Sequence, residues 1–114
     1  MSTSVTGTER IRVCATAELP LEDVRVVDVH GHRVAVFHTD EGFFAIDDRC
    51  THQDAALSDG FLEGCEVECP LHASKFDLRT GAVDAPPATV PVHTYPTAVE
   101  QDIVFVEFAG GAGR

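Results

Sequence analysis

The sequence predicts an all-β protein built as an antiparallel sandwich or barrel, and three observations support this class. Short runs rich in β-branched and aromatic residues recur along the 114 residues. Turn sequences containing glycine separate the runs, and no segment shows the period of an amphipathic helix. A chain of this length forms one domain with one modest core, so we expect a single domain over residues 1–114.

The first half of the chain predicts one strand followed by a three-stranded meander. Tight-turn sequences, Gly31-His32 and Asp40-Glu41-Gly42, separate the strands of the meander. The expected strands are Ile11 to Thr16, Val24 to Val29, Arg33 to Thr39 and Phe43 to Asp47.

The second half predicts shorter strands, with a turn at Thr80-Gly81 and a rigid loop at Ala85, Pro86 and Pro87. Its Gly-rich end, residues 109–114, is expected to be a flexible tail. The expected strands are Cys65 to Glu68, Phe76 to Leu78, Val90 to His93, Ala98 to Glu100 and Ile103 to Phe108.

Two short strings predict a metal site. Cys50-Thr51-His52 and Cys69-Pro70-Leu71-His72 each offer one thiolate and one imidazole. Zinc fingers usually place two Cys in one string and two His in the other, whereas here each string is mixed. In Rieske centres, two His replace two Cys on one iron of a [2Fe-2S] cluster, and two mixed loops produce that arrangement. Mixed spacings also occur in several zinc folds, so a zinc-stabilised interaction module is an alternative.

From Asp47 through Gly81, the strings CTHQDAALSDG and CPLHASKFDLRTG resemble the Rieske family. Within it, the chain resembles the small soluble ferredoxins that feed electrons to bacterial aromatic-ring-hydroxylating oxygenases. The resemblance implies the Rieske fold, an antiparallel β-sandwich with an inserted cluster-binding subdomain near residues 48–78. It also implies one [2Fe-2S] cluster. One iron would be bound by Cys50 and Cys69 and the other by His52 and His72.

Departures from the high-potential Rieske proteins predict a low potential. Those proteins have an extra, disulfide-forming Cys in each loop, where this chain has Ala55 and Leu71. They also have a Tyr that donates to a ligand sulfur, where this chain has Phe76. Fewer donors leave the reduced cluster less stabilised, so we expect a potential of about −150 mV. Ser74 is the exception, because it matches a Ser that donates to a bridging sulfide.

Residues beside the ligands allow two interpretations. Gln53, Asp54 and Lys75 either meet a partner protein or satisfy the backbone of the loops. Pro86 and Pro87 lie where the family has a proline-containing loop that covers the cluster, but an ordinary strand connection explains them equally well. The remaining Cys and His residues are interpreted as structural or surface residues and not as ligands: Cys14, Cys65, His30, His32, His38 and His93.

The charge and hydropathy patterns restrict the partners and the location. Eight basic and nineteen acidic residues give a net charge of −11, which argues against nucleic acid and anionic membranes. The acidity favours a partner with a basic docking face, or serves solubility alone. No apolar run is long enough for a signal peptide or for the roughly twenty residues of a membrane span. We therefore expect a soluble, cytoplasmic monomer.

The expected function is one-electron transfer without catalysis. A catalytic domain with a mononuclear iron does not fit in this length, and a glycine-rich nucleotide motif is absent from the sequence. The resemblance implies two partners that dock near His52 and His72: a flavoprotein reductase and a terminal non-haem iron oxygenase acting on aromatic or related apolar compounds. The alternative is a permanently bound small subunit, such as the Rieske-type subunit of assimilatory nitrite reductase.

Overall fold

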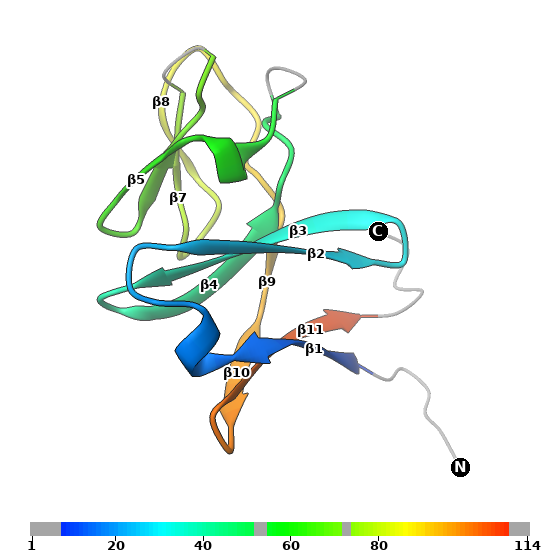
Figure 1. The fold of residues 1–114 in the computed structure, drawn as a ribbon. Helices are drawn as coiled ribbons and strands as arrows, with labels where there is room; N and C mark the ends of the chain where they lie inside the picture. The colour runs from blue at the N-terminus through cyan, green and yellow to red at the C-terminus, as the bar shows by residue number, and fades with distance from the viewer. Residues whose placement is uncertain (1–7, 52–54, 72–73, 110–114) are drawn as a thin grey trace.

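The computed structural model describes residues 8–51, 55–71 and 74–109, whose regular structure consists almost entirely of antiparallel strands in three sheets (Figure 1). The predicted all-β class is confirmed. The first sheet has the order β1-β11-β10 (Thr8–Ala15, Ile103–Ala109, Thr97–Glu100). The second has the order β2-β3-β4-β9 (Val24–Val29, His32–Thr39, Gly42–Asp47, Thr94–Tyr95). The third has the order β5-β6-β7-β8 (Phe61–Glu63, Glu66–Glu68, Lys75–Asp77, Val83–Ala85).

The predicted meander is present as β2, β3 and β4. Its first turn places His30 and Gly31 at φ values of 53° and 87°, the left-handed backbone that a two-residue hairpin requires. Its second turn ends at Gly42, with a φ of 127°. These turns fix the register, so that Val24 lies opposite Phe37 and Val34 lies opposite Asp47. Two 3-10 turns, η1 (Thr16–Glu18) and η2 (Leu57–Asp59), complete the described elements.

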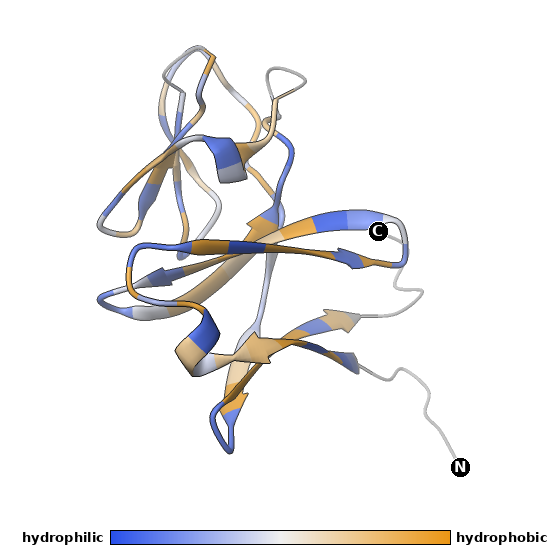
Figure 2. Ribbon diagram, in the orientation of Figure 1, coloured by the Kyte–Doolittle hydropathy of each residue, from blue (hydrophilic) through white to orange (hydrophobic). Residues whose placement is uncertain are grey.

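Two hydrophobic cores lie on opposite faces of β3. Val34 and Val36 contribute to the core shared with the β1-β11-β10 sheet. Ala35 and Phe37 contribute to the core shared with the β5-β8 sheet. A continuous apolar run is typical of a strand buried on both faces. In Figure 1 the β2-β3-β4-β9 sheet therefore lies between the other two, and in Figure 2 hydrophobic segments line strands of all three sheets.

The prediction of a strand from Val90 to His93 is wrong. This segment has no strand structure, and the chain pairs with β4 only from Thr94, which begins β9. Pro91 has no N–H to donate to a ladder. The N–H of Val92 instead donates to the carbonyl of Gly81, at 2.9 Å. Three short strands, β5, β8 and β9, were not predicted.

The two remaining cysteines are buried thiols, as predicted. Cys14 lies in the core between the first two sheets, and Cys65 lies in the turn between β5 and β6. A bulge between Arg12 and Cys14 shifts the register of β1, which buries Cys14 together with its neighbour Val13. Burial raises the pKa of both thiols. They are therefore neutral at physiological pH.

Two further predictions concern the C-terminal tail and membrane-spanning segments. The expected tail begins one residue too early, because Ala109 ends β11; residues 110–114 lie outside the described residues. In the described part of the chain, no helix has the length and hydropathy needed to cross a membrane.

Candidate metal centre

The first ligand loop follows β4. Arg49 forms an isolated antiparallel bridge with Ala56, and the N–H of Cys50 donates to the carbonyl of Ala55 at 2.9 Å. Cys50 is 3% exposed. The predicted ligand His52, and with it Gln53 and Asp54, lies outside the described residues.

The second ligand loop connects β6 to β7. Glu68 pairs with Lys75, and the N–H of Cys69 donates to the carbonyl of Ser74 at 2.7 Å. Cys69 is 1% exposed. The predicted ligand His72 lies outside the described residues.

The two loops are built in the same way. In each, a buried Cys follows a bridged residue, its N–H bonds to the carbonyl five residues later, and a His lies within the loop so closed. Cys50 and Cys69 belong to one hydrophobic core, and none of the four cysteines forms a disulfide. Two thiolates in one water-poor core, each with an imidazole in its own loop, fit the two-Cys, two-His donor set of a Rieske cluster.

Ser74 ends the second ligand loop, and Phe76 follows it on β7. Phe76 is fully buried on β7, in the same core as Cys50 and Cys69, and its ring has no group that donates a hydrogen bond. Ser74 is also fully buried, and its Oγ accepts a hydrogen bond from the N–H of Ala88 at 3.0 Å. Accepting this bond uses a lone pair of the oxygen, so the hydroxyl proton of Ser74 can still be donated.

The proline segment that follows β8, residues 86–90, forms hydrogen bonds with both ligand loops. Its Ala88 N–H bonds Ser74 in the second loop, and its Val90 carbonyl accepts a hydrogen bond from Thr51 Oγ1 in the first loop at 2.6 Å. Pro86 and Pro87 themselves are exposed. The segment therefore connects the two loops through hydrogen bonds. Sequence reasoning did not identify Thr51 or Ala88.

Asp48 is a second residue that sequence reasoning missed. Its side chain is 2% exposed, and it accepts hydrogen bonds from the N–H of Ser58 at 2.7 Å and from Arg33 Nη2 at 3.1 Å. A hollow of about 210 Å³ beside the first loop is lined by Arg33, Asp48, Arg49, Ala55 and Ala56. One sequence signal was available: Asp48 continues the inward-facing alternation of Ile46 and Cys50.

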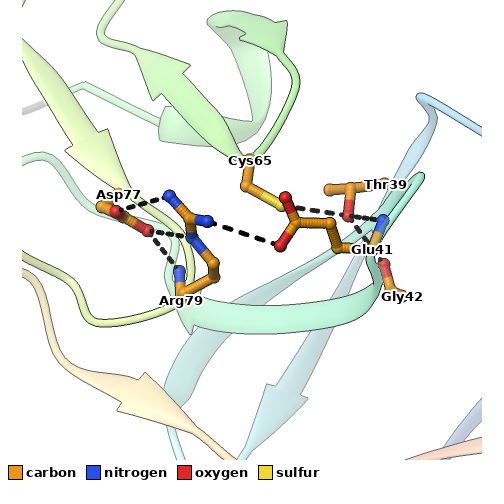
Figure 3. Close-up of polar contacts among 6 residues, drawn as sticks. All are labelled: Thr39, Glu41, Gly42, Cys65, Asp77 and Arg79. Carbon is orange, nitrogen blue, oxygen red and sulfur yellow. Dashed lines mark hydrogen bonds and ion pairs between the residues drawn. The ribbon is translucent and has the colours of Figure 1, made fainter.

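A polar network links the β3-β4 turn to the β5-β8 sheet (Figure 3). Arg79 Nη2 lies 3.1 Å from Asp77 Oδ2, and Arg79 Nη1 lies 3.4 Å from Glu41 Oε1. The Sγ of Cys65 lies 3.2 Å from Thr39 Oγ1. The hydrogen bond from Arg79 lowers the pKa of Asp77 below its ordinary value. This contact therefore stabilises the fold at neutral pH, and the contribution is lost as the pH falls through the lowered pKa.

One group of potential metal donors lies beside this network. Oxygens of Asp40 and Glu41 and the Sγ of Cys65 lie within 4.8 Å of one another. The two carboxylates are exposed, Glu41 pairs with Arg79, and burial keeps the Cys65 thiol protonated by raising its pKa. We therefore do not assign Asp40, Glu41 and Cys65 as a metal site.

The outer face of the β5-β8 sheet is acidic. Glu66 lies opposite Glu63 on β5 and opposite Asp77 on β7, and Glu68 lies opposite Phe61, which is largely exposed. Like charges at opposed positions of a sheet are destabilising. Lys75 offsets them partly, since its Nζ lies 4.0 Å from Glu66 Oε1. Lys75 therefore lies on this face, directly after the second ligand loop.

Replacing Glu66 with glutamine is expected to stabilise the fold at neutral pH. Burial raises the pKa of Glu66, and a hydrogen bond with Asp84 raises it further. A carboxyl with a raised pKa stabilises the fold below pH 4.5, its ordinary pKa, and this contribution is lost as the pH rises through the raised value. The Tm of Glu66→Gln should exceed that of the wild type at pH 7, with the gap closing near pH 4. Glu22→Gln, at an exposed position outside this sheet, is the control, and an equal gain there would contradict the assignment.

Comparison with known proteins identifies the family. Residues 9–96 match a family model described as the Rieske [2Fe-2S] domain, and the chain belongs to this family. It is 45% identical over 95 residues to the 3-phenylpropionate/cinnamic acid dioxygenase ferredoxin subunit of Photorhabdus laumondii, with 82% of this chain and 90% of the relative covered. It is 40% identical over 99 residues to the ferredoxin component of the naphthalene 1,2-dioxygenase system of Pseudomonas aeruginosa, with 87% and 95% covered.

Solved structures agree with this assignment. The ferredoxin of carbazole 1,9a-dioxygenase from Nocardioides aromaticivorans IC177 matches with a TM-score of 0.82 and 34% identity, covering 85% of this chain and 95% of that one. A ferredoxin solved in complex with the oxygenase of carbazole 1,9a-dioxygenase matches with a TM-score of 0.80 and 35% identity, covering 84% of this chain and 99% of that one. An NADH-dependent nitrite reductase small subunit from Mycobacterium tuberculosis matches with a TM-score of 0.80 but only 24% identity, covering 89% of this chain and 96% of that one. This likeness shows the fold alone.

These findings confirm three predictions made from the sequence: the family, the Rieske fold and the [2Fe-2S] cofactor. The curated relatives are electron-transfer components of dioxygenase systems and not their catalytic enzymes.

Proposed function

We propose that this chain is the ferredoxin component of a dioxygenase system. It would pass single electrons from a flavoprotein reductase to a terminal non-haem iron oxygenase that hydroxylates aromatic or related apolar compounds. The observation that supports this most directly is the pair of matched loops, which bring two buried cysteines into one core. The names of the relatives at 40–45% identity indicate the kind of system.

We propose four ligands for the cluster. Cys50 and Cys69 would bind one iron, and His52 and His72 the other, within a subdomain near residues 48–78 of a single domain spanning 1–114. When bound, the cluster supplies one electron reversibly, and its two thiolates give the oxidised form a formal charge of zero. The chain buries the thiolates and excludes water from them, while Phe76 offers their sulfurs no donor.

The surface around the ligand loops suits transient docking. Leu71 lies next to His72 in the sequence and is 60% exposed, and Val90, bonded to Thr51, is 56% exposed. Exposed apolar residues beside charged ones are typical of interaction surfaces. The acidic outer face of β6 extends to Glu68, the residue directly before Cys69. We propose that both partners dock here, near His52 and His72, through basic surfaces of their own, and that the chain works as a cytoplasmic monomer.

A permanently bound subunit of another oxidoreductase is the alternative. Nitrite reductase small subunits share the fold at 24% identity, well below the dioxygenase ferredoxins. Size-exclusion chromatography of the native lysate distinguishes the two. A carrier with a net charge of −11 should elute as a free monomer at high salt. Co-elution with one large complex at every salt concentration would contradict the carrier.

The midpoint potential is expected to be about −150 mV, at the low end of Rieske centres. Phe76 and Leu71 stand where high-potential members have a sulfur donor and a disulfide, and only Ser74 retains a hydroxyl there. A redox titration monitored by visible absorbance measures the potential. Phe76→Tyr should raise it by restoring a donor. A wild-type midpoint well above zero would contradict this expectation.

A further inference from the structure

The stems of the two ligand loops differ. The second loop closes on strands β6 and β7, which pair at Val67 and Phe76 as well as at Glu68 and Lys75. The first loop closes on the isolated bridge between Arg49 and Ala56, after which the chain turns into η2. A single bridge fixes a stem less firmly than a ladder does, so another group has to secure the first loop.

Asp48 is that group. It lies one residue before the bridge, and its carbonyl accepts a hydrogen bond from the N–H of Leu57, one residue after the bridge. Its own N–H donates to the carbonyl of Arg33 at 2.8 Å, and its Oδ1 accepts from the N–H of Ser58 at 2.7 Å. Ala56, the N-cap of η2, provides no side-chain hydrogen bond, so the carboxylate of Asp48 satisfies a donor of this turn.

The burial of this carboxylate has an electrostatic consequence. Among the residues that the structure describes, Asp48 is the single acidic one that is buried. Burying a carboxylate is costly unless charged or polar groups pair with it. Arg33 supplies the opposite charge from a side chain that is 64% exposed, through Nη2 at 3.1 Å. The carboxylate thus lies in a region of low dielectric, two residues from Cys50, while the arginine is partly screened by water.

We propose that Asp48 is a positioning residue of the metal centre: it secures the stem of the first ligand loop in place of a strand ladder, and together with Arg33 it sets the local charge beside Cys50. The inference rests on the cluster ligands proposed above. Its electrostatic part predicts opposite effects for the two partners, because a negative charge disfavours the reduced, more negative cluster and a positive charge favours it.

The test is the midpoint potential of the purified holoprotein. Asp48→Asn, which keeps an acceptor for Ser58, should raise the potential, and Arg33→Gln should lower it by a smaller amount because its charge is screened. The potential of the double variant should lie between those of the two single variants and above that of the wild type. Asp59→Asn removes an exposed charge from η2 and is the control, with a smaller shift than Asp48→Asn. Shifts of the same sign in both single variants, or an Asp48→Asn shift no larger than that of the control, would overturn the proposal.

A second measurement addresses the stem. Asp48→Ala loses two charge-assisted hydrogen bonds, and it should release iron to a chelator about tenfold faster than the wild type. The rate of iron release from Asp48→Asn should lie between those of the wild type and Asp48→Ala. The rate from Asp59→Ala should equal that of the wild type. An Asp48→Ala rate equal to that of the wild type would count against the stem role. A wild type without a cluster would overturn the proposed ligands as well, whereas an intact cluster with unshifted variants would overturn this inference alone.

Discussion

Replacing Cys50 with alanine is expected to give a protein that contains no [2Fe-2S] cluster. The thiolate is a proposed iron ligand, and alanine in this buried position offers no replacement donor. The visible absorbance of the purified protein and its iron content measure the result, and both should fall to background.

Cys14→Ala is the matched control for this variant. Cys14 is also a buried thiol, but it lies in the other hydrophobic core, between the first two sheets. We expect this variant to retain full absorbance and two irons per chain. Loss of the cluster in Cys14→Ala, or its retention in Cys50→Ala, would contradict the proposed ligand set.

Replacing Gly81 with alanine is expected to destabilise the fold by about 3 kcal/mol. Gly81 has a φ of 81°, and an added Cβ would collide with the carbonyl oxygen of Val92 and lie 3.1 Å from Thr94 Cγ2. The first neighbour is backbone and is itself fixed, because the N–H of Val92 donates to Gly81. Relief of the collision would move Val92, which is buried in the core that contains the proposed cysteine ligands. Urea unfolding measures the free energy of unfolding.

Gly31→Ala separates the collision from the backbone conformation. Gly31 has a similar φ of 87°, but a Cβ there would meet no atom within 4 Å. Only the cost of the left-handed backbone remains, which is about 1 kcal/mol. Equal destabilisation at the two positions would show that the contact with Val92 has no effect.

The sequence was sufficient to predict the elements that depend on local pattern. The meander follows from runs rich in β-branched and aromatic residues and from glycines placed where positive φ is needed, at Gly31 and Gly42. Cys65, Val67 and Cys69 alternate with glutamates in the sequence, and all three are buried. The proposed ligand Cys69 therefore lies two residues after the buried strand position Val67.

Features that depend on distant contacts were not predictable. Val90 to His93 has strand-like composition, but Thr51 and Gly81 fix this segment from elsewhere in the chain. The alternation of Asp48 with Ile46 and Cys50 indicates that it faces inward but does not indicate its partners, which are Arg33, fifteen residues earlier, and the N–H of Ser58. Such roles arise from tertiary structure and leave little trace in local composition.

The most direct test of the central claim is electron paramagnetic resonance of the dithionite-reduced protein. Mixed ligation by two cysteines and two histidines predicts a Rieske-type signal with nitrogen couplings from two imidazoles. The signal should be lost in His52→Ala and changed or lost in His72→Cys. A colourless protein that binds one equivalent of zinc, with no signal after reduction, would contradict the account.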